Sequence, residues 1–267
     1  MVDRRTFVLG GAGVVAVGAV GAAGWGLAPD RAKRLLGAGP DPYVPAAPEG
    51  RVRLERVRSA AMGGEVDLFT AVPAGHGDGA GLPVVLVMHG ASATAARFRD
   101  FGLARFVTEA VRRGAAPFVL AGTDDGPNGW LPDGSGADPR RLVTEELPRW
   151  LAERGFDSGR RGLWAWSRGG LGALRLLEER PRLVRAAALF SPALVQGDPV
   201  FDSERELAGL PLGFWCGTSD PFRDAVRAFV AGLPEAPDVT TFAPGAHTRL
   251  FWNDHTLAAF RWLAGHL

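Results

Sequence analysis

The segment around Ser167 has the residue types and spacing of a serine placed for nucleophilic attack. It reads Leu163-Trp-Ala-Trp-Ser-Arg-Gly-Gly-Leu-Gly172, an apolar strand pattern followed by small residues that open a helix. This predicts the sharp strand-to-helix turn of the pattern G-x-S-x-G, here with Ala165 replacing the first glycine, since only small side chains fit two residues either side of the serine. Such a turn sets the serine at a helix N-terminus, where main-chain N–H groups stabilise an oxyanion. An ordinary serine N-cap is the alternative interpretation.

Two later segments carry an acid and a base. Asp220 follows the apolar run Pro211–Cys216, and His247 follows the run Val239–Phe242. Imidazole suits a general base because its pKa lies near neutrality. A helix N-cap is an alternative interpretation of the aspartate, since a proline follows it. With the order Ser, Asp, His along the chain, these patterns predict Ser167 as nucleophile, His247 as base and Asp220 as the acid that orients the base.

A pair of oxyanion donors is expected beside the serine. The apolar run Pro83–Met88 ends in a His-Gly-Ala-Ser sequence, and the N–H groups of Ala91 and Arg168 are the predicted donors. We assign His89 a scaffolding role. The Arg168 side chain has two alternatives: it points away from the site, or it contacts an acidic group of the substrate. Trp130, on a polar loop beyond a strand end, is predicted to line the substrate pocket.

The other candidate side chains are assigned no chemistry. His255 is expected on the surface of the last helix. Cys216, the only cysteine, lies in an apolar run and is interpreted as a small buried hydrophobic residue. No spacing of histidines or carboxylates indicates a metal site.

Short apolar runs alternate with helical patterns from residue 51 onward. Arg51–Ser59 and Glu65–Val72 alternate apolar and polar residues, which predicts an antiparallel hairpin at a sheet edge. Further strands are predicted at Pro83–Met88, Pro117–Ala121, Gly162–Trp166, Arg185–Phe190, Pro211–Cys216 and Val239–Phe242. Helices are predicted at Leu103–Arg113, Val143–Arg154 with a kink at Pro148, Leu171–Arg180 and the C-terminus. The order predicts an α/β fold with a mainly parallel central sheet and helices on both faces. The 20 residues between Phe190 and Pro211 are too few for a large lid domain.

Composition bounds the class of protein. The 267 residues include 46% hydrophobic and 22% charged residues, as in ordinary globular proteins. The net charge of +1 favours neither nucleic acid nor an anionic surface as a partner.

The N-terminus has the features of an export signal. Arg4-Arg5 is followed by 22 uncharged residues, Phe7–Ala28, rich in glycine. This predicts a twin-arginine signal or retained N-terminal anchor over residues 1–28, recognised by the twin-arginine export machinery. A buried glycine-rich element of the fold is the alternative. Residues 29–50 have the Pro/Gly-rich composition of a linker, so residues 51–267 are expected to form the catalytic domain outside the cytoplasm, secreted or anchored to the outer face of the membrane.

The sequence resembles the esterase D-like family of α/β-hydrolases, which includes carbohydrate-ester esterases, siderophore esterases and cell-wall mycolyltransferases. The resemblance rests on Leu163–Arg175, Leu189–Ala193, Thr144–Trp150, Gly245–His247 and Phe251-Trp252. It implies the α/β-hydrolase fold, a Ser-Asp-His triad at Ser167, Asp220 and His247, and no cofactor. Many members have glycine in place of Ala165 and methionine or another apolar residue in place of Arg168.

The sequence therefore favours an exported serine hydrolase that cleaves carboxylic esters, small or polymer-linked, through an acyl-enzyme. Two alternatives stay open. One is an acyltransferase that moves an acyl group to a sugar or lipid hydroxyl. The other is a hydrolase-like binding protein without catalytic activity.

Overall fold

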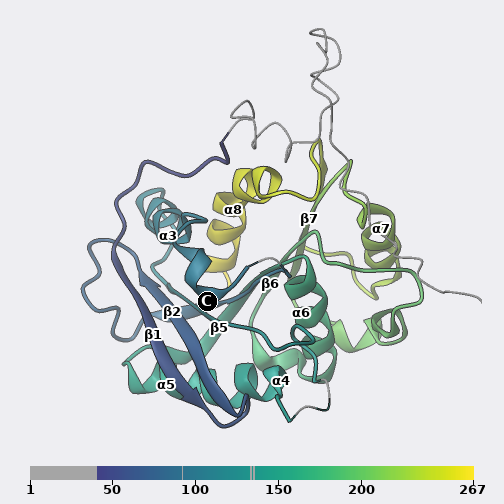
Figure 1. Ribbon diagram of the computed structural model, residues 1–267. Coiled ribbons are helices and arrows are strands. Elements are labelled where there is room, and N and C mark those ends of the chain that lie inside the picture. The colour runs from purple at the N-terminus through teal and green to yellow at the C-terminus, as the bar shows by residue number, and fades with distance from the viewer. Residues whose placement is uncertain (1–40, 92, 133, 135) are drawn as a thin grey trace, which may run out of the picture. The chain divides into compact units, whose positions relative to one another are not determined.

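An eight-stranded sheet organises the chain (Figure 1). The structure is a computed structural model that describes residues 41–267 except 92, 133 and 135. The strands are β1 Arg51–Ser59, β2 Gly64–Val72, β3 Pro83–Met88, β4 Val119–Thr123, β5 Asp157–Trp166, β6 Ala187–Phe190, β7 Leu212–Gly217 and β8 Val239–Ala243. Their order across the sheet is β1-β2-β4-β3-β5-β6-β7-β8. The pairs β1/β2 and β2/β4 are antiparallel, and all other neighbours are parallel. The predicted α/β fold and mainly parallel sheet are confirmed.

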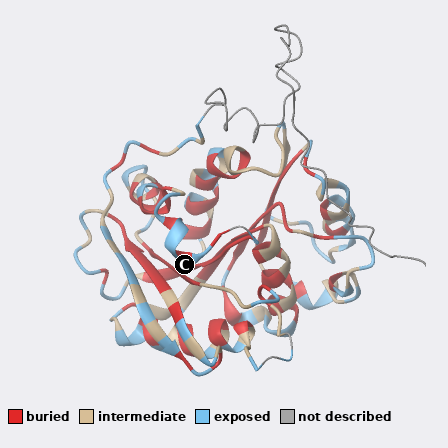
Figure 2. Ribbon diagram, in the orientation of Figure 1, coloured by how far each residue is buried: buried red, intermediate tan, exposed pale blue. Residues whose placement is uncertain are grey.

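Helices cover both faces of this sheet. They are α3 Leu103–Arg112, α4 Pro139–Arg141, α5 Leu147–Glu153, α6 Arg168–Glu179, α7 Arg223–Gly232 and α8 Arg249–Ala264. Each face of the sheet has its own apolar cluster. One contains the buried side chains of α3 and α8, and the other contains those of α5, α6 and α7. The central strands are buried from both sides, as Figure 2 shows, which explains their unbroken apolar runs. All the parallel strands therefore present their carboxyl ends, and the loops that follow them, at one edge of the sheet.

The observed elements differ from the predicted ones mainly at their ends. β5 begins at Asp157, five residues before the predicted Gly162, because its exposed start carries polar residues instead of an apolar run. β4 runs from Val119 to Thr123 rather than from Pro117 to Ala121. Helix α7 was not among the predicted helices. Its first turn follows Asp220, whose carboxylate accepts a hydrogen bond from the Phe222 N–H at 2.9 Å.

The predicted kink at Pro148 takes the form of a π-helical turn. The segment η2, Leu142–Glu146, joins α4 to α5, and the Leu147 N–H bonds to the Leu142 carbonyl five residues back. Proline has no N–H to donate to the carbonyl four residues back, so the wider turn just before it keeps the helix continuous.

Part of the predicted linker packs against the domain. Chain contacts group Pro42–Leu267 as one compact unit. Asn253 Nδ2 donates to the Tyr43 carbonyl at 2.7 Å, and Ala47 is buried. Residues 42–50 are therefore part of the folded domain. Residues 1–40, with the predicted signal and most of the predicted linker, lie outside the described residues. Of the helices that the structure describes, none is long and apolar enough to cross a membrane.

A buried carboxylate fastens the β1–β2 hairpin to the helix beneath it. Glu146, only 5% exposed, accepts hydrogen bonds from Ser59 Oγ at 2.5 Å and from the N–H groups of Ala60 and Ala61 at 3.0 and 3.1 Å. These bonds satisfy main-chain N–H groups of the turn that follows β1.

We expect Glu146→Ala to lower the free energy of unfolding by about 3 kcal/mol, because it leaves the buried Ser59 hydroxyl and the N–H groups of Ala60 and Ala61 without their acceptor. Urea denaturation followed by tryptophan fluorescence measures this. Glu153→Ala is the control, since Glu153 forms only an exposed ion pair with Arg149 at 3.8 Å and should leave the midpoint nearly unchanged. Equal midpoints for the two variants would contradict the role given to Glu146.

Candidate active site

Ser167 lies on a strained turn between β5 and α6. Its backbone angles are φ 57° and ψ −124°, in a region that residues with a side chain rarely adopt. Two main-chain hydrogen bonds hold the turn. The Ser167 N–H donates to the Phe190 carbonyl at 2.9 Å, and the Ser167 carbonyl accepts from the Ala193 N–H at 3.0 Å. The predicted strand-to-helix turn is thus present, and it directs the side chain toward the carboxyl edge of the sheet.

The requirement for glycine after the serine has a different cause from the one expected. A Cβ at Gly169 would collide with the carbonyl oxygens of Met88 and His89, at the end of β3. The nearest obstacle is therefore the neighbouring strand rather than the side chain of Ala165. Gly90 is similarly restricted, because a Cβ there would lie 2.9 Å from Ser167 Cβ. These two glycines let the end of β3 approach the serine.

His247 and Asp220 lie within hydrogen-bonding distance of each other and of the serine. His247 Nε2 is 2.9 Å from Ser167 Oγ, and His247 Nδ1 is 2.9 Å from Asp220 Oδ2. The carboxylate accepts, so Nδ1 carries the proton and Nε2 is left as an acceptor for the serine hydroxyl. The three predicted side chains, from loops after β5, β7 and β8, are brought together.

The surroundings fix the imidazole and the carboxylate in place. The Asp220 side chain is fully buried, and its second oxygen accepts from the Phe222 N–H. The N-cap of α7 is Phe222, so Asp220 is not the helix N-cap; it accepts from the turn that precedes the helix while it is hydrogen-bonded to His247. The rings of Phe222 and Trp252 lie edge-on to the imidazole, with centroids 5.0 and 5.1 Å away. The Ser219 N–H donates to the Gly245 carbonyl at 2.8 Å, which joins the two loops that carry the acid and the base.

The predicted oxyanion donors flank the serine. Arg168 is the first residue of α6, so its N–H has no intrahelical acceptor. The Gly90 carbonyl accepts from His89 Nδ1 at 2.9 Å and from the Ala93 N–H at 3.2 Å. In a trans peptide the N–H points opposite to the carbonyl, so the Ala91 N–H points away from these two partners. His89 is fully buried, in agreement with its predicted scaffolding role.

The Arg168 side chain contacts the protein rather than an open pocket. Its Nη2 is 2.5 Å from Asp125 Oδ2, in the loop after β4. The guanidinium is thus paired with a carboxylate of the protein, and the two alternatives for Arg168 stay predictions. The sequence analysis did not single out Asp125. The available signal was a pair of carboxylates, Asp124 and Asp125, directly after a strand of the sheet.

Trp130 requires a correction. It was predicted to line the substrate pocket, but it is only 2% exposed. Its Nε1 donates to the His89 carbonyl at 2.9 Å, and its ring packs edge-on against the His89 imidazole at 5.2 Å. A Cβ at Gly172 would collide with the tryptophan. The polar loop places Trp130 inward, as packing between α6 and the end of β3.

Other candidates for chemistry lie away from the serine. Cys216 is fully buried, and burial raises the pKa of its thiol to about 12, which confirms it as a structural residue. His255 is half-buried against Phe251, rather than on the surface, and burial lowers its pKa. Within the part of the chain that the structure describes, no group of three or more His, Cys, Asp or Glu side chains could hold a metal ion.

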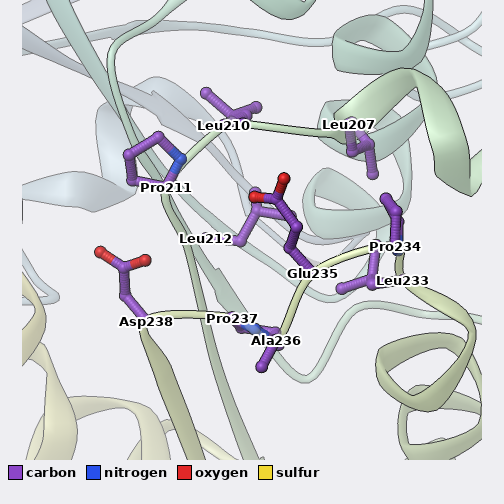
Figure 3. Close-up of a pocket in the computed structure, with 11 residues that line it drawn as sticks. Leu207, Leu210, Pro211, Leu212, Leu233, Pro234, Glu235, Ala236, Pro237 and Asp238 are labelled. Atoms are coloured by element: carbon purple, nitrogen blue, oxygen red, sulfur yellow. The ribbon is translucent and has the colours of Figure 1, made fainter.

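A small cavity of about 90 Å³ lies at the opposite end of the sheet (Figure 3). The starts of β7 and β8 and the turns before them form it. Leu212 and Asp238, which line it, are at the amino ends of strands parallel to β5, whereas Ser167 follows the carboxyl end. The cavity is therefore separate from the serine.

Several solved hydrolase structures have a fold similar to that of this chain. A ferulic acid esterase has a TM-score of 0.68 and 16% identity, covering 84% of this chain and all of the other. An S-formylglutathione hydrolase from Agrobacterium tumefaciens has a TM-score of 0.66 and 18% identity, covering 84% and 98%. The fluorophosphonate-binding serine hydrolase F of Staphylococcus aureus has a TM-score of 0.67 and 14% identity, covering 81% and 99%. These similarities show the α/β-hydrolase fold.

The sequence itself identifies the family. Residues 59–226, more than half of the chain, match the family described as "Putative esterase". A search of curated proteins found no match. The chain therefore belongs to this esterase family of α/β-hydrolases, in agreement with the predicted esterase D-like resemblance.

The strain at Ser167 predicts an unusual order of stability. Ser167→Gly should unfold with a free energy about 1 kcal/mol higher than Ser167→Ala, because glycine tolerates positive φ and the relief of strain exceeds the entropy that glycine adds to the unfolded chain. Thermal or urea unfolding measures the difference. At Ser158, within strand β5, the same pair of substitutions should give the opposite order, because glycine in a strand interior is destabilising. A glycine variant less stable than alanine at both positions would refute the strain.

Proposed function

We propose that this protein is an exported serine hydrolase that cleaves carboxylic esters. The observation that carries the proposal is the continuous set of hydrogen bonds from Asp220 through His247 to Ser167, with both distances 2.9 Å. A structural serine would have no need of a histidine acceptor held by a buried carboxylate. Membership of an esterase family agrees with the proposal.

The proposed reaction begins with proton transfer from Ser167 Oγ to His247 Nε2. The oxygen attacks the ester carbonyl carbon and forms a tetrahedral intermediate, whose negative oxygen accepts from the N–H groups of Ala91 and Arg168. When the intermediate collapses, the ester C–O bond breaks and the leaving alcohol takes the proton from Nε2. Asp220 stabilises the imidazolium that exists between these steps.

Water completes the cycle by the same route. It gives a proton to His247 Nε2 as its oxygen attacks the acyl carbon. The acyl bond to Ser167 Oγ then breaks, and the serine recovers its proton as the carboxylic acid leaves. No protein group other than those of the triad and the oxyanion donors is needed, and the chemistry needs no cofactor.

The substrate class is proposed as esters of aromatic or small acids. The segment between β6 and β7 contains only the short turns Pro199–Asp202 and Glu204–Leu207, so the described residues between these strands form no lid domain. A ferulic acid esterase is among the structures with the same fold, which supports ferulate esters as first test substrates. No observation favours transfer of the acyl group to an alcohol over transfer to water.

Full-length protein is expected to react covalently with a fluorophosphonate probe and to hydrolyse p-nitrophenyl acetate. Ser167→Ala should abolish labelling and lower kcat by about 10⁴-fold or more, because the nucleophile is removed. Ser203→Ala, a serine away from the triad, is the control and should label like wild type. Absence of labelling in folded wild-type protein would overturn the catalytic proposal and favour a binding protein.

Export is the second part of the proposal, supported by Arg4-Arg5 and the uncharged segment that follows. Arg4→Lys combined with Arg5→Lys should retain the protein in the cytoplasm, because the paired arginines are what the export machinery recognises. Cell fractionation with immunoblotting measures this, and Arg31→Lys with Arg34→Lys is the matched control. Equal distribution of the two double variants would contradict export by this route.

A further inference from the structure

Two adjacent carboxylates follow β4 and reach different segments. Asp124 Oδ1 accepts from the Ala95 N–H at 2.9 Å, and Asp124 Oδ2 accepts from the Asp67 N–H at 3.1 Å. Asp124 thereby ties the loop after β3 to β2. Asp125 instead lies beside Arg168 and His89. β4 and β3 are neighbours and β3 pairs with β5, so this loop lies beside both segments that carry the proposed oxyanion donors.

The Asp125 carboxylate lies beside Arg168, which carries one of the proposed donors, and beside His89, which precedes the other donor, Ala91, by two residues. Its Oδ2 is 2.5 Å from Arg168 Nη2, and its Oδ1 is 3.9 Å from His89 Nε2. The Asp125 side chain is only 12% exposed and the His89 side chain is fully buried. Among the described residues, neither His89 Nε2 nor Arg168 Nε has a hydrogen-bond partner. Asp125 is thus paired with Arg168, whereas its distance from His89 Nε2 is too long for a hydrogen bond.

Arg168 and His89, the two residues beside Asp125, are each linked to one of the proposed oxyanion donors through the main chain. His89 Nδ1 donates to the Gly90 carbonyl, which fixes the peptide whose N–H belongs to Ala91. Arg168 carries the other donor on its own backbone. Its side chain is also confined by Gly129, where a Cβ would lie 2.8 Å from Arg168 Cδ. A shift of the Arg168 side chain would therefore rotate or displace its own N–H, one of the two donors of the proposed oxyanion hole.

The energetics argue against a purely structural ion pair. Burial raises the pKa of Asp125, while Arg168 and His89 offset this effect. Burial also lowers the pKa of His89. A buried charge pair seldom stabilises a fold more than well-packed apolar side chains would.

We propose that Asp125 is a positioning residue: by holding the Arg168 guanidinium, it fixes the Arg168 N–H group in the geometry that binds the oxyanion. This inference rests on the proposed function, which supplies the reaction. It concerns the transition state, because the oxyanion forms only there. Loss of Asp125 should therefore lower kcat and leave KM nearly unchanged.

The test uses full-length protein with p-nitrophenyl acetate, and compares wild type, Asp125→Asn, Arg168→Met and the double variant. We expect each single variant to lower kcat by about 10- to 100-fold with KM within about twofold, since small displacements of a donor have effects of that size. The double variant should lose no more than the stronger single one, because the two side chains act as a unit. Arg168→Met keeps the backbone N–H and serves if Asp125→Asn does not fold.

Asp198→Asn is the matched control. Asp198 is similarly buried, with 14% of its side chain exposed, and it pairs at 3.5 Å with Arg175, further along the same helix α6. This control should keep wild-type kcat. Wild-type kcat in Asp125→Asn and Arg168→Met, or an equal loss in Asp198→Asn, would overturn the positioning role while leaving the proposed hydrolase standing. A wild-type protein that neither hydrolyses the ester nor reacts with fluorophosphonate would overturn both.

Discussion

The close approach of the end of β3 to the first turn of α6 is the constraint on which the site depends. It exists because position 169 has no side chain: a single methyl group there would meet two carbonyl oxygens. This approach brings Gly90 next to Ser167, so that the main chains of the two residues lie close together. The approach requires a strained backbone conformation at Ser167 that few residues adopt. The hydrogen bonds to Phe190 and Ala193 hold Ser167 in this conformation.

The loops at the carboxyl edge of the sheet act as a connected layer. The acid and base loops are joined through Ser219 and Gly245, and the β4 loop is joined to β2, to the segment after β3 and to α6 through its two aspartates. Each loop alone is a short irregular segment. Their order comes from bonds between loops, which is how a catalytic geometry can be built from segments without regular structure.

The strands and the juxtaposition of Ser167, His247 and Asp220 could be predicted from the sequence because their signals are local. An apolar run marks β3 whatever surrounds it, and the small residues near Ser167 mark the turn directly. Trp130 and Asp125 could not be placed in this way. A tryptophan and an aspartate on a polar loop suit solvent, a pocket or the core equally well, and only the packing against Gly172, His89 and Arg168 decides. The start of β5 was missed for a related reason: its polar residues form strand hydrogen bonds without an apolar pattern.

The single buried thiol has a practical consequence. With Cys216 enclosed and its thiolate disfavoured, the fold neither requires an oxidising compartment nor exposes a group that forms mixed disulfides. A cysteine introduced at any exposed position would be the only readily alkylated site. A spectroscopic label or a surface linker could thus be attached near the carboxyl edge of the sheet without first replacing the native cysteine.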